Sequence, residues 1–123
     1  MAETLEAFNA FRARMNEALQ AGNLTISRFF ALDHRVYEAG ALGAKTKEML
    51  GLVASLVLRC DDCVTYHVIR CAEEGVSDEE FQEVFAVGLV VGGSIVIPHL
   101  RRATARLEEV RSAGSRRQET SQR

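Results

Sequence analysis

The chain has 123 residues, of which 47% are hydrophobic and 26% are charged, as is ordinary for a single globular domain. Its 15 basic and 17 acidic residues leave a formal net charge of −2, which gives no electrostatic reason to expect nucleic acid or an anionic membrane as a partner. One proline, no tryptophan and the lack of alternating β-branched runs favour an all-α fold. We therefore predict a single-domain bundle of about six helices.

Apolar residues at helical spacing, together with end signals, predict the helices in chain order. They cover residues 3–21, 27–39, 45–59, about 61–74, 78 to the glycines at 92–93, and 97–110. Asp61 or Asp62 is expected to cap the fourth helix, and Gly40 and Gly75 to end the second and fourth. Ser77 and Glu80 have the spacing of a capping box. The third helix is apolar nearly all round in its second half, so it should be central or pack against another subunit.

The ends of the chain and its longest apolar stretch bear on location. The first residues contain acidic side chains and no basic segment followed by an apolar run, so no secretory signal is expected. The apolar stretch over 85–97 is shorter than the roughly 20 residues of a membrane span. We predict a cytoplasmic protein with a helical domain over 1–111. Residues 112–123 have no apolar anchor and are predicted to be a disordered tail.

The segment RCDDCVTYH, residues 59–67, contains two cysteines three positions apart and a histidine four positions after the second. At a helix start, His67 would lie on the same face as Cys63. The imidazole and the helix N-terminus would both favour a thiolate, and Cys60 could close a disulfide with it. In a reducing compartment such a pair is more often catalytic or metal-binding than structural, and three cysteines do not suggest an extracellular disulfide framework.

Other interpretations of these residues stay open at this point. Cys60, Cys63 and His67 could bind zinc with His34 or His99 as the fourth ligand, but the second ligand pair of structural zinc sites is absent. The remaining side chains have simpler interpretations. Cys71 is predicted to be a core residue, His34 structural, His99 a surface histidine or a group reaching a neighbouring subunit, and Arg101 and Arg102 solvated charges. Taken alone, Glu48 would be interpreted as a first-turn acid that complements the helix dipole.

With Glu48 included, the pattern becomes E-x11-C-x-x-C-x3-H. The segment from Ala44 to Gly93 resembles the alkylhydroperoxidase-D-like group of the carboxymuconolactone decarboxylase superfamily. The resemblance implies an all-helical fold assembled as a homotrimer or homohexamer. It also implies reduction of a hydroperoxide or a disulfide. Cys63 would attack the peroxide, and Cys60 would resolve the sulfenic acid as a disulfide and face a dithiol or thioredoxin-like reductant. Glu48 and His67 would relay protons, with no cofactor or metal.

One departure from the group lies between the cysteines. Studied members have a histidine where this chain has Asp62, and an acid there should raise thiol pKa values and weaken peroxidase turnover. Decarboxylases of the superfamily typically lack the cysteine pair. A decarboxylase-like enzyme and a non-catalytic zinc- or ligand-binding module are the alternative functions.

Overall fold

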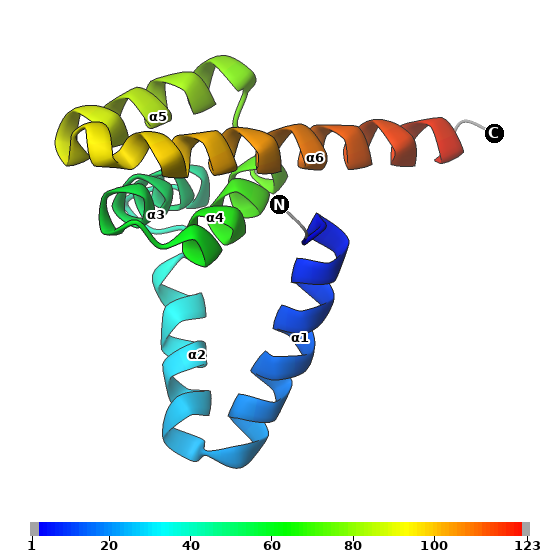
Figure 1. The fold of residues 1–123 in the computed structure, drawn as a ribbon. Coiled ribbons are helices and arrows are strands. Elements are labelled where there is room, and N and C mark those ends of the chain that lie inside the picture. The colour runs from blue at the N-terminus through cyan, green and yellow to red at the C-terminus, as the bar shows by residue number, and fades with distance from the viewer. Residues whose placement is uncertain (1–2, 122–123) are drawn as a thin grey trace. The chain divides into compact units, whose positions relative to one another are not determined.

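The computed structural model describes residues 3–121, and their side chains as far as Gln118. Within this range it has six α-helices, one short 3₁₀ helix and no strand (Figure 1). The elements are α1 (Leu5–Gly22), α2 (Leu24–Val36), α3 (Ala44–Leu58), α4 (Asp61–Glu73), α5 (Asp78–Gly92), η1 (Ser94–Val96) and α6 (Ile97–Ser121). The predicted single-domain, all-α fold of about six helices is confirmed.

The contacts group into two compact units, the first of which contains α1 and α2. These helices form a hairpin that turns at Asn23 (Figure 1). The Asn23 side-chain oxygen accepts the Ile26 N–H at 3.1 Å and so caps α2. Because of this cap, α2 begins earlier than predicted. It ends at Val36 with Tyr37 as its C-cap, so the prediction that Gly40 ends it was wrong.

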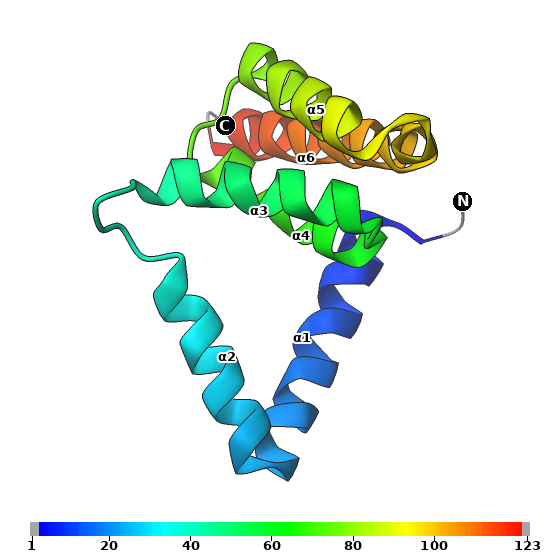
Figure 2. The ribbon, with the colours of Figure 1, turned by 90° about the vertical axis from the view of Figure 1, so that its left-hand side faces the viewer.

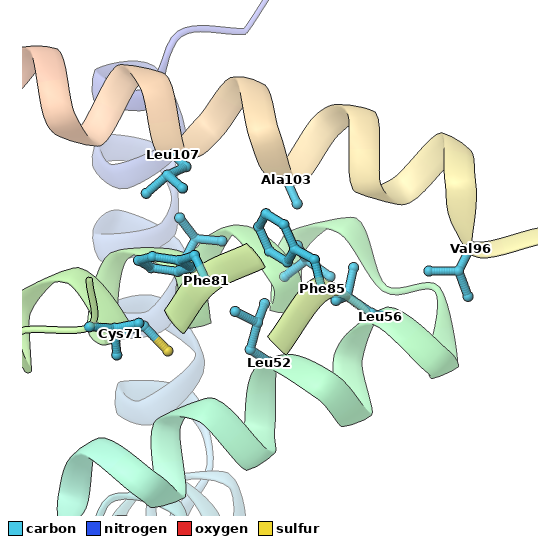
Figure 3. Close-up of a cluster of buried hydrophobic side chains, with 11 residues drawn as sticks. Leu52, Leu56, Cys71, Phe81, Phe85, Val96, Ala103 and Leu107 are labelled. Atoms are coloured by element: carbon cyan, nitrogen blue, oxygen red, sulfur yellow. The ribbon is translucent and has the colours of Figure 1, made fainter. Parts of the chain in front are cut away.

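The second unit contains α3 to α6. Here α3 contacts both α4 and α5, and α6 contacts α4, with α3 and α4 on one side and α5 and α6 on the other (Figures 1 and 2). Figure 3 shows the core between them. Its buried side chains include Leu52, Leu56, Cys71, Phe81, Phe85, Val96, Ala103 and Leu107. The predicted central position of the third helix is confirmed, since Leu52 and Leu56 are 0% exposed.

The predicted capping box is also present. The Ser77 hydroxyl accepts the Glu80 N–H at 3.1 Å, and the Glu80 carboxylate accepts the Ser77 N–H at 2.9 Å. Gly75, at φ 82°, follows α4 as expected of a glycine past a helix end. These local signals fix the start of α5 and the reversal that precedes it.

The last helix is longer than the sequence suggested. α6 continues to Ser121, so residues 112–121 are helical where a disordered tail was predicted. Arg111 supplies the missing anchor: Nε donates to Asp78 at 2.9 Å, Nη2 donates to the Val76 carbonyl at 2.9 Å, and the guanidinium lies over the Phe81 ring. The last residues of the predicted tail, 122–123, lie outside the described range. No helix in residues 3–121 is both long and apolar enough to cross a membrane.

Candidate functional site

The two neighbouring cysteines lie at the turn between α3 and α4. Arg59, with φ 60°, is the only non-glycine residue of the described chain in the left-handed region, and it reverses the chain after α3. Cys60 then caps α4: its sulfur accepts the Cys63 N–H at 3.3 Å. The prediction that Asp61 or Asp62 caps α4 was therefore wrong. Both residues occupy the first turn of the helix. A cap sulfur lies where the helix dipole favours negative charge.

Cys60 and Cys63 are joined as a disulfide, with Cα atoms 5.2 Å apart, a usual separation for such a bond. The bond closes a ring that contains Asp61 and Asp62. Within this chain Cys63 is exposed and Cys60 is only partly so. Small reactants can therefore reach Cys63 from solvent.

A carboxylate shared by a histidine and an arginine joins α3 to α4, and we call Glu48, His67 and Arg70 the buried triad. Glu48 of α3 is 1% exposed and His67 of α4 is 7% exposed. Glu48 Oε1 lies 2.9 Å from His67 Nδ1, and Glu48 Oε2 lies 3.4 Å from Arg70 Nε. The interpretation of Glu48 as a mere dipole-complementing acid was wrong, because it is buried against a histidine from another helix.

The charge of Arg70 in this triad is set by burial and by its acidic neighbours. Burial tends to lower the pKa of Arg70. Its hydrogen bond to Glu73 and the charges of Glu73 and Glu48 outweigh that effect, so the Arg70 pKa lies above its ordinary value. His67 Nδ1 lies within hydrogen-bonding distance of the Glu48 carboxylate. When Nδ1 carries the proton and donates it to Glu48, Nε2 of a neutral imidazole carries a lone pair.

Cys71 lies deeper, in the apolar core, as predicted. Burial, and to a smaller extent the charge of Glu48, raises the pKa of its thiol to about 12. A thiol with such a pKa stays protonated near neutral pH and is a poor nucleophile. Cys71 therefore belongs to the packing of the site and not to its chemistry.

A second carboxylate shared by a histidine and an arginine belongs to the disulfide ring itself, and we call Asp61, His99 and Arg102 the surface triad. Asp61 Oδ1 lies 2.7 Å from His99 Nδ1, and Asp61 Oδ2 accepts a hydrogen bond from Arg102 Nη1 at 3.1 Å. The Asp61 and Arg102 side chains are 40% and 52% exposed. Arg102 is therefore a solvated charge, as predicted, that also pairs with Asp61, and His99 contacts the cysteine turn of its own chain.

Sequence reasoning missed Arg70 and both partners of Asp61, yet the sequence contains a signal for them. His67 on α4 and His99 on α6 are each followed three residues later by an arginine, Arg70 and Arg102. Side chains three apart on a helix are neighbours, so each pair can hold one carboxylate between them. His34 is exposed on α2. In the described part of the chain, no three or more His, Cys, Asp or Glu side chains are grouped so as to hold a metal ion.

Comparison with known proteins gives a consistent picture. The model of the carboxymuconolactone decarboxylase family matches residues 23–106. An uncharacterized protein in the cox locus of Paracoccus denitrificans is 29% identical over 101 residues, which cover 82% of this chain and 91% of that protein.

Two solved structures extend the likeness. One is a carboxymuconolactone decarboxylase family protein of Thermotoga maritima, for which a role in the antioxidative response has been suggested. It is 56% identical with a TM-score of 0.84, over 89% of this chain and 93% of that one. A family member from Legionella pneumophila, at 19% identity and a TM-score of 0.75, shares the fold over 84% of this chain and 92% of its own.

Proposed function

The chain belongs to the carboxymuconolactone decarboxylase family, and we propose that it is a thiol-dependent peroxidase or disulfide reductase. The observation that carries the proposal is the Cys60–Cys63 disulfide at the start of α4, with the buried Glu48–His67 hydrogen bond on the two helices that flank it. A redox pair needs a reachable sulfur, a second thiol and a base, and these four residues supply them. The suggested antioxidative role of the Thermotoga relative agrees with this chemistry.

In the proposed oxidation, the Cys63 thiolate attacks the outer oxygen of a hydroperoxide. The O–O bond breaks, Cys63 becomes a sulfenic acid and the alkoxide takes a proton to leave as an alcohol. The Cys60 thiolate then attacks the Cys63 sulfur, and the hydroxyl group leaves as water once it gains a proton. The two thiols have together given two electrons to the peroxide and are left as a disulfide.

His67 and Glu48 manage the protons in this scheme. His67 Nε2 takes the proton of a thiol, and the imidazolium that forms is stabilised by the Glu48 carboxylate 2.9 Å from Nδ1. The same proton can then be returned to the leaving alkoxide. Cys60 suits its resolving role because its sulfur, as the cap of α4, already accepts the Cys63 N–H.

A dithiol or thioredoxin-like reductant in the cytoplasm would restore both thiols, itself becoming a disulfide and balancing the two electrons.

We also propose a homotrimer or homohexamer. Large apolar side chains are exposed late in α5, in η1 and at the start of α6. They include Val87, Val90, Val91, Ile95 and Ile97, and Val90 is 84% exposed. Apolar surface of this kind is typically covered in assemblies.

The test is peroxide consumption by the full chain with a dithiol as reductant. We expect Cys63→Ser to abolish turnover and Cys60→Ser to accumulate a sulfenic acid that dimedone traps on Cys63. Cys71→Ala serves as the matched control and should retain activity. An active Cys63→Ser protein would exclude the proposal, and decarboxylation of a lactone by the double cysteine variant would favour the decarboxylase alternative. Stoichiometric zinc on the reduced wild type, with slow alkylation, would favour the binding module.

A further inference from the structure

The disulfide ring contains two acids with different surroundings. Asp61 is held by His99 and Arg102 of α6, at 2.7 Å and 3.1 Å. Asp62, the next residue, is exposed and has no ion pair within the described residues. Only one of the two ring charges is therefore tied to another helix, across 38 and 41 residues of sequence.

A carboxylate near a thiolate disfavours it, because like charges repel. Asp61 directly follows Cys60 and lies one position before Asp62 in the same ring, so its carboxylate could turn toward either sulfur or away from both. Its two partners both come from α6, which contacts α4. Pairing with them holds the carboxylate on the α6 side and supplies positive charge next to the ring.

We propose that the surface triad is an electrostatic clamp on the redox ring, in which His99 and Arg102 are positioning residues that keep the Asp61 charge away from the sulfurs and so keep the reduced cysteines reactive. The proposal rests on the proposed function only in taking Cys60 and Cys63 as a pair that can be reduced to thiols. It accounts for how the chain has two acids between its cysteines without both charges opposing the thiolate. It also gives His99 and Arg102 a role that neither has in the proton relay.

The experiment measures alkylation of the reduced, full-length protein by iodoacetamide at pH 7, with mass analysis of the peptides that contain Cys60 and Cys63. Arg102→Gln should slow alkylation about two- to fivefold, the range that ion pairs between exposed side chains span. Arg101→Gln is the matched control. It removes the same charge one residue away on α6, from an exposed side chain with no partner in the described structure, and should change the rate less than about 1.5-fold.

A double-mutant cycle separates clamping from simple charge. Charges at fixed positions act additively, whereas an Asp61 carboxylate held by His99 alone, after Arg102 is lost, is freer to turn toward the sulfurs. Asp61→Asn should therefore raise the rate less than about twofold in the wild type but about two- to fivefold in the Arg102→Gln background. Asp62→Asn should raise the rate by the same factor in both backgrounds.

Two further measurements exclude a merely structural effect. Arg102→Lys keeps the charge and should recover most of the wild-type rate. Raising the salt concentration from about 0.02 M to about 0.5 M should shrink the difference between Arg102→Gln and wild type, because exposed charges are screened over a few ångströms at high salt. Equal effects of Arg101→Gln and Arg102→Gln, an additive cycle with Asp61, or no change in rate would each overturn the clamp. A wild type that neither consumes peroxide nor reduces a disulfide but shows the expected cycle would reject the proposed function and leave the clamp standing.

Discussion

The buried triad and the surface triad each join an acid, a histidine and an arginine, and they differ in how far water reaches them. In the buried triad, Glu48 is 1% exposed between α3 and α4. In the surface triad, the Asp61 side chain is 40% exposed between the start of α4 and α6. Each carboxylate contacts a histidine Nδ1 and an arginine, at similar distances. From the residue types and distances alone, the ion pairs of the two triads would be expected to contribute equally to stability.

The surroundings decide otherwise. Charges that cannot be solvated depend on their partners, so loss of one partner is costly, whereas exposed pairs are screened and contribute little. Loss of a partner should therefore matter more in the buried triad than in the surface triad. Arg70 has both buried and exposed partners. Its side chain is one-third exposed and pairs with the buried Glu48 as well as with Glu73 and Glu74 at the surface.

The largest expected contrast comes from the same carboxylate-to-amide change in each triad. Glu48→Gln removes the group that stabilises protonated His67, and we expect the kcat/KM for peroxide to fall about 100-fold or more, as general acid–base groups contribute. Asp61→Asn leaves the relay intact and should change kcat/KM less than about twofold. Steady-state peroxide assays on both variants measure the difference.

Glu80→Gln serves as a control for that contrast, because Glu80 is an exposed acid of the capping box on α5. It should leave kcat/KM unchanged. If Asp61→Asn proved as damaging as Glu48→Gln, exposure would not be what separates the triads.

A smaller contrast is expected in stability. Arg70→Met leaves the Glu48 carboxylate buried without its cation, and the free energy of unfolding should fall by about 2 kcal/mol. This is below the cost for a fully buried pair because Arg70 is partly exposed. Arg102→Met should cost under about 1 kcal/mol. Urea unfolding followed by circular dichroism gives both values.

The surface partners of Arg70 provide the control for its variant. The double variant Glu73→Gln/Glu74→Gln removes those ion pairs and leaves the Arg70–Glu48 contact. It should cost less than Arg70→Met. Equal costs would assign the stabilisation to the rim and not to the buried carboxylate.

Local signals in the sequence predicted what depends on local physics. Ser77 and Glu80 formed their capping box, and the apolar third helix took its central place, because caps and burial patterns act over a few residues. Glu48 was singled out only through the family resemblance, since its burial depends on a helix 19 residues further along.

The predictions that were wrong concern one local feature, the cap of α4, and contacts between distant segments. Cys60 caps α4 in place of the aspartates because the turn at Arg59 puts its sulfur over the Cys63 N–H. The partners of Asp61 lie on α6, and the anchor that extends α6 is a contact of Arg111 with Val76 and Asp78. Local periodicity shows that His99 and Arg102 share a helix face, but not which residue more than 30 positions away they contact.

The smallest expected effect is on the pH dependence of the free energy of unfolding. It uses Cys71 to test how well the core near Glu48 excludes water. The thiol ionises near pH 9.0 in the unfolded chain and near 12 in the folded one. Between these values the unfolded state releases a proton that the folded state keeps, so stability is fully present below about pH 9 and falls as pH rises toward 12. Cys71→Ala lacks this thiol, so its free energy of unfolding should approach that of the wild type as pH rises from about 9. Urea unfolding at pH 8, 9 and 10 measures it, and parallel curves for the two proteins would mean that Cys71 and the charge of Glu48 beside it are better solvated than the 1% exposure of Glu48 indicates.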